Sequence, residues 1–541
     1  MKKPWHAFYP KTIPFELEIP ACSIYHLLER STQDFPDHTA IIERDMEMTY
    51  TELKRTVDRF AAALHRRGFK KGDRFGIMLF NCKEYLIAYF GVQRLGGIVV
   101  QLNPMYQEYE LNFMLSDAEP LWLLCESSQV EKLERTNYTS NLTIITIDRV
   151  NNGYAYLNNW IEEESDSLPP LQINSREDIA FLQYTGGTTG IPKGVMITHY
   201  NSLATTYHTY ITDEGALQRP GERYLGVFPM FHGAGLQVML SAIFNAGSYI
   251  AISHLRLHDA LFLIRKYQPS HISAPPTVFV GLLNHLDFKE DDLKCLKVCR
   301  SGAAPIPLEV LQDFEKKSGV QISEAYGLTE SNAITVRTLL NGVRKNGCVG
   351  IPVPNSDIKI VDLETGLQEM PIGEAGEILL KGPQIMKGYW KNPEETARTL
   401  RNGWLHTGDI GTLDENGFLS IVGRKKEMII AGGYNIYPNE IDEILYQHPA
   451  VAEACTFGIP DNYRGETVKV AIVVKKQYSL TEVDIIDWCR ERLAKYKVPK
   501  QVEFRKQLPK SAVGKILRRA LVEEHHKQIK DMKVITKKTE Y

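Results

Sequence analysis

The sequence lacks the usual features of a secreted, zinc-binding or nucleic-acid-binding protein. The two lysines at the N-terminus are followed by no apolar run of the signal-peptide kind. The eight cysteines form neither a Cys-x-x-Cys pair nor a zinc-like cluster with histidine. Scattered cysteines without a leader are typical of a reduced, cytoplasmic protein. The net charge is only −3, so we expect no nucleic-acid partner.

Charged residues are also absent from the whole of residues 224–253. A membrane-spanning helix needs about 20 apolar residues, so the length of this stretch alone would allow one. Pro229, His232 and four glycines interrupt it, and we predict instead a buried strand, loop and helix of an α/β core. Peripheral contact at the inner membrane face and homodimer formation stay open.

A chain of 541 residues is too long for one compact core, so we expect at least two domains. In its larger first part, short β-branched or aromatic runs alternate with amphipathic helical stretches. The predicted strands are residues 74–81, 98–103, 120–125, 142–148 and 179–185, and a helix is predicted over residues 51–68. This alternation predicts α/β subdomains with largely parallel sheets.

We place the main domain boundary after Gly423. Residues 1–423 are predicted to form the N-terminal domain, which includes a small antiparallel, barrel-like piece in the glycine-rich sequence from residue 347 to 389. Residues 424–541 show a shorter α+β pattern and an excess of basic over acidic residues. Such a basic domain is suited to holding a polyanionic ligand, although a plain solvated surface would have the same composition.

The strongest local signal is the segment Tyr184-Thr-Gly-Gly-Thr-Thr-Gly-Ile-Pro-Lys-Gly-Val195, which follows a predicted buried strand. Glycines let backbone N–H groups approach phosphate oxygens, hydroxyls add donors, and a lysine neutralises charge. The segment is not a Walker A loop, because Pro192 precedes Lys193 and Gly194 follows it. A flexible surface turn is the alternative interpretation.

Four further segments occur in order after this loop: Glu324-Ala-Tyr-Gly-Leu-Thr-Glu330, Thr407-Gly-Asp409, Gly423-Arg-Lys-Lys426 and Pro509-Lys-Ser-Ala-Val-Gly-Lys515. Together the five segments resemble the motifs of the adenylate-forming superfamily, which comprises acyl-CoA synthetases, adenylation domains and beetle luciferases. They are spread over nearly the whole chain. The resemblance implies ATP-dependent formation of an acyl-AMP with release of pyrophosphate.

The resemblance also implies a nucleotide and metal site. Tyr326 is expected to stack on adenine, while Asp409 accepts hydrogen bonds from the ribose and Arg424 adds a donor. Glu330 and the Thr185 hydroxyl are expected to hold Mg2+, which prefers oxygen ligands. The implied nucleotide-binding residues are Thr185, Gly186, Gly187, Thr188, Thr189, Gly190, Lys193, Gly302, Ala303, Ala304, Glu324, Ala325, Tyr326, Gly327, Thr329, Asp409, Arg424 and Lys515.

The implied catalytic residues are Lys515, Glu330 and His232. The Lys515 ammonium would bridge the substrate carboxylate and the α-phosphate, where it offsets charge on both. In this superfamily a mobile C-terminal domain rotates about a hinge, for which Lys426 is the candidate. The rotation would bring Gly432 and Gly433 to the tunnel that admits coenzyme A, because absent side chains leave room for a thin thiol arm.

Within the superfamily, the sequence looks most like bacterial long-chain fatty acid–CoA ligases. This likeness rests on the opening Lys-Pro-Trp-His-Ala-Phe-Tyr-Pro and on Ala431-Gly-Gly-Tyr-Asn-Ile-Tyr-Pro438. The acyl pocket is then expected at His232, Gly233, Leu236, Gly302 and Gly327. Two alternatives stay open: loading of the acyl group onto a carrier-protein thiol, and luciferase-type oxygenation.

Overall fold

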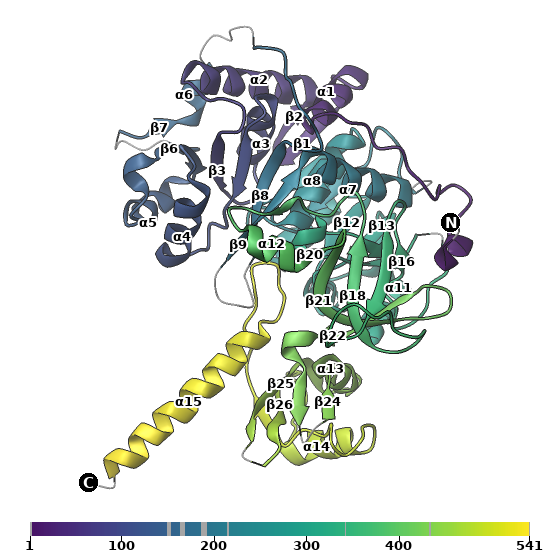
Figure 1. The fold of residues 1–541 in the computed structure, drawn as a ribbon. Coiled ribbons are helices and arrows are strands. Elements are labelled where there is room, and N and C mark those ends of the chain that lie inside the picture. Colours follow the sequence, from purple (N-terminus) through teal and green to yellow (C-terminus); the bar gives the residue numbers. More distant parts are fainter. Residues whose placement is uncertain are drawn as a thin grey trace.

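A computed structural model describes residues 3–148, 153–162, 168–185, 192–213, 216–340, 342–431, 434–461 and 463–539 (Figure 1). Two large mixed sheets and a smaller antiparallel sheet are followed by a fourth sheet near the C-terminus. The α/β class is therefore confirmed, including the parallel-rich large sheets and the antiparallel piece.

The first large sheet has eight strands in the order β19-β9-β8-β4-β3-β5-β6-β7. Its strands are β3 (Arg74–Met78), β4 (Ile98–Gln101), β5 (Trp122–Cys125), β6 (Thr143–Thr146), β7 (Ala155–Tyr156), β8 (Ile179–Thr185), β9 (Lys193–Thr198) and β19 (Gly388–Tyr389). All neighbours from β8 to β7 pair in parallel, whereas β9 and β19 form an antiparallel edge. The five predicted strands are confirmed, four of them shorter than predicted.

Shortly after the end of β3, Asn81 connects the two large sheets. Its side-chain amide donates to the carbonyl oxygens of Gly226, at 2.9 Å, and Phe228, at 3.0 Å. Its carbonyl oxygen accepts the backbone N–H of Met230 at 2.7 Å. A buried amide with both ends satisfied fixes the loop that carries the predicted acyl pocket.

The second large sheet has nine strands in the order β16-β15-β14-β13-β12-β10-β11-β1-β2. Its strands are β1 (Thr39–Glu43), β2 (Met46–Thr49), β10 (Arg223–Gly226), β11 (Ser248–Ala251), β12 (His271–Ala274), β13 (Val298–Ser301), β14 (Ile322–Tyr326), β15 (Val336–Arg337) and β16 (Ile351–Pro352). The uncharged stretch predicted to be strand, loop and helix forms β10, α8 (Gly233–Phe244) and β11. Of the helices described, none is both long enough and apolar enough to span a bilayer.

Helices cover the faces of both large sheets (Figure 1). The others in this part of the chain are α1 (Tyr25–Asp34), α2 (Tyr50–Arg66), α3 (Lys83–Arg94), α4 (Glu108–Ala118), α5 (Val130–Glu134), α6 (Leu157–Glu162), α7 (His199–Thr212), α9 (Leu257–Tyr267), α10 (Pro276–Leu283) and α11 (Leu308–Ser318). Helix α2 begins with a capping box, in which Thr49 and Glu52 satisfy each other's backbone N–H groups. It ends just before Gly68, whose φ is +87°.

The small antiparallel sheet consists of β17 (Asp357–Val361), β18 (Gly376–Lys381), β20 (Leu400–Arg401), β21 (Trp404–Leu413) and β22 (Leu419–Arg424). Helix α12 (Pro393–Thr399) lies between β19 and β20 in sequence. Strand β22 ends at Arg424, and the one-turn helix η6 (Lys425–Glu427) follows directly. The boundary predicted after Gly423 therefore lies at the end of this sheet.

The C-terminal unit has its own sheet and its own apolar cluster, which includes Ile441, Val470 and Ile485. Its elements are β23 (Ile429–Ala431), β24 (Tyr434–Ile436), α13 (Pro438–Tyr446), β25 (Val451–Asp461), β26 (Gly465–Val474), α14 (Glu482–Arg490), β27 (Gln501–Phe504) and α15 (Arg518–Thr539). Figure 1 shows α15 extending away from the rest of the molecule. Between β27 and α15, the yellow loop turns back toward the large unit (Figure 1).

Candidate functional site

The two ends of the glycine-rich loop lie side by side. Thr185 ends β8 and Lys193 begins β9, and these two residues are directly paired in the antiparallel ladder. The loop residues predicted to bind phosphate, Gly186, Gly187, Thr188, Thr189 and Gly190, lie outside the described residues. The strand–loop–strand arrangement places one hydroxyl and one ammonium at the same end of the sheet.

The predicted adenine and ribose residues are joined by hydrogen bonds. The Tyr326 hydroxyl donates to Asp409 Oδ2 at 2.8 Å, and Arg424 Nε lies 2.9 Å from Asp409 Oδ1. Asp409 and Arg424 are cross-strand partners in β21 and β22. Burial raises the pKa of the Asp409 carboxyl, and the charge of Arg424 opposes that rise. The carboxylate is thus held in one orientation by two donors.

Lys515 reaches this network from the C-terminal unit. Burial, followed by the positive charge of Arg424, lowers the pKa of Lys515 to about 8, while the charges of Glu427 and then Asp409 partly oppose this. Among the described residues, no carboxylate lies within salt-bridge distance of the Lys515 ammonium. A partly buried ammonium without a direct counter-ion is suited to an anionic ligand.

The loop before Lys515 is pressed against the large unit. Gly514 has a φ of +74°, which favours glycine, and a Cβ added there would lie 2.7 Å from Thr277 Oγ1. Within the loop, the Ser511 backbone N–H donates to the Lys515 carbonyl at 2.8 Å. This close approach delivers the Lys515 side chain to the interface between the two units.

His232 lies close enough to Lys515 for their charges to interact. Burial, and then the charge of Lys515, lower the pKa of His232 to about 4, so the ring is neutral near pH 7. Its Nδ1 accepts the backbone N–H of Ala234 at 3.2 Å and caps α8. A neutral ring committed to a helix cap is suited to forming a pocket wall, and it is not suited to transferring protons at neutral pH.

Glu330 is held by a residue that motif reasoning did not include. The Tyr389 hydroxyl donates to Glu330 Oε1 at 2.8 Å, and the Glu330 carbonyl accepts the Met386 N–H at 2.8 Å. The Lys193 ammonium lies over the Tyr389 ring, 5.2 Å from its centroid, and forms an ion pair with Glu395. Tyr389 therefore connects the predicted metal ligand with the predicted phosphate ligand.

The segment between Ser301 and Pro305 follows β13 and has the form of a nucleotide cradle. Gly302 is open, because an added Cβ would have only Ala325 O within 4 Å, at 3.8 Å. Ala303 has a φ of +67°, a conformation that is unusual for a residue with a Cβ. Ala304 follows as the third small residue of this strand end. Small residues and open space at a strand end are suited to a flat ligand.

Strand β14 carries the remaining predicted adenine residues. Burial raises the pKa of Glu324 to about 7, and the charge of Arg344 opposes this while Glu315 and Glu443 add to it. Ala325 is paired with Arg337 of β15, and Thr329 begins the 3-10 helix η5 (Thr329–Ser331). Glu324 thus lies close enough to Glu443 of the C-terminal unit for their charges to interact.

The predicted acyl-pocket residues differ in the space around them. Nothing lies within 4 Å of a Cβ added at Gly233, whereas a Cβ at Gly327 would lie 2.3 Å from Ala333 O. Leu236 is fully buried within α8. Gly233 and Gly302 therefore border open space, and Gly327 allows close backbone packing.

The hinge candidate Lys426 lies in η6, directly after the small antiparallel sheet. The predicted coenzyme A tunnel residues Gly432 and Gly433 lie outside the described residues.

The predicted metal ligands Thr185 and Glu330 offer a hydroxyl and a carboxylate oxygen. Two protein oxygens suit Mg2+, which binds through few side chains together with water and substrate phosphates.

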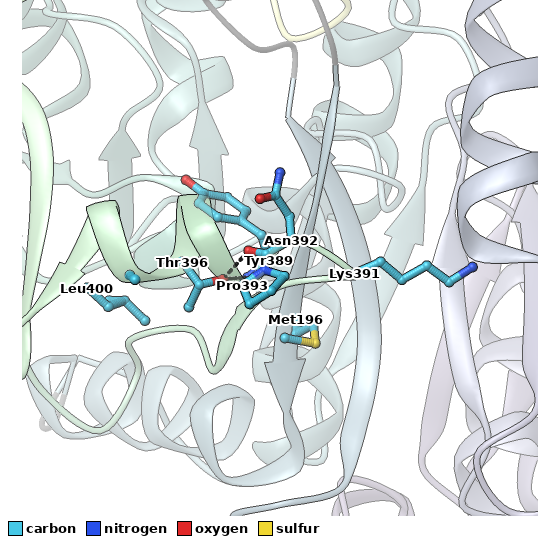
Figure 2. Close-up of a pocket in the computed structure, with 8 residues that line it drawn as sticks. Met196, Tyr389, Lys391, Asn392, Pro393, Thr396 and Leu400 are labelled. Atoms are coloured by element: carbon cyan, nitrogen blue, oxygen red, sulfur yellow. Dashed lines mark hydrogen bonds between the residues drawn. The ribbon is translucent and has the colours of Figure 1, made fainter.

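A mostly apolar hollow of about 420 Å³ opens beside β9 and α12, next to the Lys193 and Tyr389 contacts (Figure 2). Its lining residues are Met196, Tyr389, Lys391, Asn392, Pro393, Thr396, Ala397 and Leu400. Sequence reasoning missed this segment's role because Tyr389 and Glu395 are distant in sequence from Glu330 and Lys193. The signal available was the Gly-Tyr-Trp run ending at Trp390.

Two family models match the chain. The model described as AMP-binding enzyme matches residues 28–390, and the AMP-binding enzyme C-terminal domain matches residues 440–515. The two matches include the glycine-rich loop, the Tyr326 segment and Lys515. The family comparison thus covers both units that contribute to the site.

Among curated proteins, a long-chain-fatty-acid–CoA ligase of Bacillus subtilis is 42% identical over 97% of this chain and 99% of its own length. A protein with the same description from Escherichia coli O6:H1 is 37% identical over 97% of this chain and 98% of its own length. The similarity therefore extends over nearly the full length of this chain and of both relatives.

Solved structures are similar over most of the chain. ATP-bound MatB from Rhodopseudomonas palustris matches with a TM-score of 0.85 and 29% identity, covering 93% of this chain and 99% of that chain. The o-succinylbenzoate coenzyme A synthetase of Bacillus subtilis, in complex with ATP and magnesium ion, matches with a TM-score of 0.78 and 30% identity. That match covers 91% of this chain and 98% of the other.

Proposed function

The chain belongs to the AMP-binding enzyme family, and from that premise we propose that it is an AMP-forming long-chain fatty acid–CoA ligase. It uses ATP, Mg2+ and coenzyme A. In the first step, a carboxylate oxygen of the fatty acid attacks the α-phosphorus of ATP and pyrophosphate leaves. In the second step, the thiol sulfur of coenzyme A attacks the acyl carbonyl carbon of the acyl-AMP and AMP leaves.

We assign residues 1–423 to an ATP- and acyl-binding domain and residues 424–541 to a mobile domain. Tyr326 contacts adenine, and Asp409 with Arg424 binds the ribose. Glu330 and Thr185 would hold Mg2+, which supplies charge neutralisation for the phosphates. The remaining nucleotide-binding residues are those predicted from the motifs.

Lys515 acts in the first step because it can face the fatty-acid carboxylate and the α-phosphate together. Negative charge accumulates on both groups as the acyl-phosphate bond forms, and a fixed ammonium stabilises this charge. His232 is the neutral wall beside the reacting carboxylate, with Gly233, Leu236, Gly302 and Gly327 around the acyl group. The supporting observations are the close approach of Gly514 to Thr277 of the large unit and the charge interactions of Lys515 with His232 and Asp409.

The second step requires Lys515 to leave. We propose rotation about Lys426, after which Gly432 and Gly433 border the passage for the pantetheine arm. The separate apolar cluster of the C-terminal unit supports movement as one body. A hinge of few residues is sufficient for such a rotation.

Pyrophosphate exchange into ATP, measured over a panel of carboxylic acids, tests the first step. We expect exchange with long-chain fatty acids, followed by thioester formation when coenzyme A is added. Exchange with none of the acids would contradict the proposal. Transfer to a carrier-protein thiol but not to coenzyme A would favour the carrier-loading alternative, and light or oxygen uptake would favour the luciferase alternative.

Two further predictions concern where the protein works and in what form. We propose a cytoplasmic enzyme that contacts the inner membrane face and forms a homodimer. Sedimentation with phospholipid vesicles tests the membrane contact, and light scattering tests the dimer. Protein that stays in the supernatant, or that scatters as a monomer, would contradict the respective prediction.

A further inference from the structure

Lys193, the predicted phosphate ligand, already has a counter-ion. Its ammonium forms an ion pair with the Glu395 carboxylate, and the two side chains are only 20% and 26% exposed. The hydrogen bond to Lys193 is the largest cause of the lowered pKa of Glu395, with Arg398 and Lys426 also contributing. At neutral pH the Glu395 carboxylate is therefore ionised, and both side chains of the ion pair are partly shielded from water.

The surroundings fix Glu395 in this place. Helix α12 begins at an N-cap, where Asn392 Oδ1 accepts the Glu395 N–H at 3.0 Å. The Thr396 hydroxyl accepts the Tyr389 N–H at 2.9 Å, which is drawn as a dashed line in Figure 2. Tyr389 is in turn paired with β9 through Val195. The carboxylate therefore belongs to the same rigid edge that carries Lys193.

Lys193 is also held from a second side by the Tyr389 ring, 5.2 Å from its ammonium. The ring and Glu395 together form a resting position for the ammonium. The same ring ends in the hydroxyl that donates to Glu330. The resting position is thus built beside the place where triphosphate and metal are expected to meet.

We propose that Glu395 is an exchangeable counter-ion, which holds Lys193 in the empty enzyme and is replaced by the triphosphate of ATP. This inference rests on the proposed function. It makes Glu395 a positioning residue, because it acts only through Lys193. A carboxylate beside a triphosphate repels it, so Glu395 weakens nucleotide binding and favours the departure of pyrophosphate. The ion pair re-forms when the phosphates leave.

The exchange predicts a direction that a purely structural role would not produce. Removal of the Glu395 charge should tighten nucleotide binding, because the ammonium is no longer engaged and the repulsion is lost. We expect Glu395→Gln to bind a non-hydrolysable ATP analogue about three- to tenfold more tightly than the wild type. Pyrophosphate should inhibit this variant at correspondingly lower concentrations. A residue that served only to support α12 would weaken binding when replaced.

Isothermal titration calorimetry of the full-length protein with the ATP analogue tests this proposal. Glu395→Asp keeps the charge and should bind near the wild-type affinity, which separates charge from shape. Glu119→Gln is the matched control, because Glu119 pairs with Lys391 of the same segment at 2.9 Å but does not contact the site. Should Glu395→Gln fail to fold, as judged by its thermal melting, Glu395→Ala removes the same charge and should also bind more tightly.

The outcomes separate the two proposals. Wild-type protein that binds no ATP analogue would contradict the proposed function itself. Wild-type protein that binds the analogue, with charge-removing variants that bind equally or more weakly, would overturn only the exchange of Glu395 for phosphate. Tighter binding confined to Glu395→Gln and Glu395→Ala supports the exchange.

Discussion

Two lysines approach the proposed nucleotide site from different parts of the molecule, and their surroundings differ. Lys193 lies in the large unit, paired with Glu395 and placed over Tyr389. Lys515 lies in the C-terminal unit and, among the described residues, faces Asp409 and His232 without a direct ion pair. One ammonium is therefore neutralised before any substrate arrives, and the other is not.

This difference matches what each lysine is expected to do. Lys193 stays with the phosphates through one step and then must release pyrophosphate, so a competing carboxylate is useful. Lys515 must enter and leave with its unit, so a strong ion pair in the site would oppose the rotation. Because the buried Lys515 ammonium forms no ion pair with the described residues, its stability in the closed site depends on the negative charge of the substrate.

The largest expected effect comes from removing one lysine and then the other. Lys515→Ala should lower the rate of acyl-adenylate formation about 100- to 1,000-fold, because a fixed cation is lost where charge develops. Thioester formation from supplied acyl-AMP should remain near the wild-type rate. Lys193→Ala should mainly raise KM for ATP. Pyrophosphate exchange and a coenzyme A transfer assay measure the two steps, and equal loss in both for Lys515→Ala would contradict its assignment.

A smaller but more selective effect is expected at the hinge. Lys426→Pro fixes φ in η6 and removes a backbone N–H, so rotation should become difficult. We expect thioester formation to fall at least about tenfold while adenylation changes little. Lys426→Ala is the control, because it removes the side chain but leaves the backbone free. If Lys426→Pro slowed only adenylation, Lys426 would not be the hinge for the second step.

Features encoded by neighbouring residues could be predicted from the sequence, whereas contacts between residues far apart in the sequence could not. The end of β8 could be predicted because a hydrophobic strand is followed directly by glycine-rich sequence, whereas β9 was not predicted. The motifs around Tyr326 and Asp409 could be recognised because each is a short continuous run of sequence that resembles a family motif. The Tyr326–Asp409 hydrogen bond and the Glu395–Lys193 ion pair could not, since they join residues far apart in sequence and no periodicity links them.

The C-terminal unit shows the same limit. Helices α13 and α14 were predictable from apolar spacing, whereas the three-residue strand β24 and the short strand β27 lie within too few residues to show a period. The position of Lys515 beside His232 depends on how two separate units dock. The close approach of Gly514 to Thr277, which no sequence pattern encodes, is one contact that shows this docking.

The pKa of Lys515 predicts how the rate of adenylation depends on pH. Its pKa of about 8 lies below the ordinary value for lysine, so the proton is present below pH 8 and is lost as the pH rises through it. For adenylation, kcat/KM should therefore fall about tenfold per pH unit above 8, because this ratio reports the free enzyme. The triphosphate favours the charged form, so the fall in kcat should occur at higher pH.

This alkaline limb should disappear in Lys515→Ala, whose residual rate no longer depends on the ammonium. The Glu324 carboxyl titrates at a lower pH than Lys515, because its pKa is raised only to about 7. Glu324→Gln should change the profile near pH 7 and leave the limb above pH 8 in place. An unchanged alkaline limb in Lys515→Ala would show that another group carries it.

The smallest effect is expected within the large unit, at the hydrogen bond between Tyr326 and Asp409. Tyr326→Phe removes the hydroxyl that donates to Asp409 at 2.8 Å but keeps the ring expected to contact adenine. Arg424 remains on the other carboxylate oxygen, so Asp409 keeps one of its two donors. Loss of one such bond costs about 1 kcal/mol, which corresponds to a KM for ATP about fivefold higher. Tyr326→Ala would lose the ring as well, so a KM equally raised in both variants would mean that the hydroxyl, and not stacking, is what this tyrosine contributes to ATP binding.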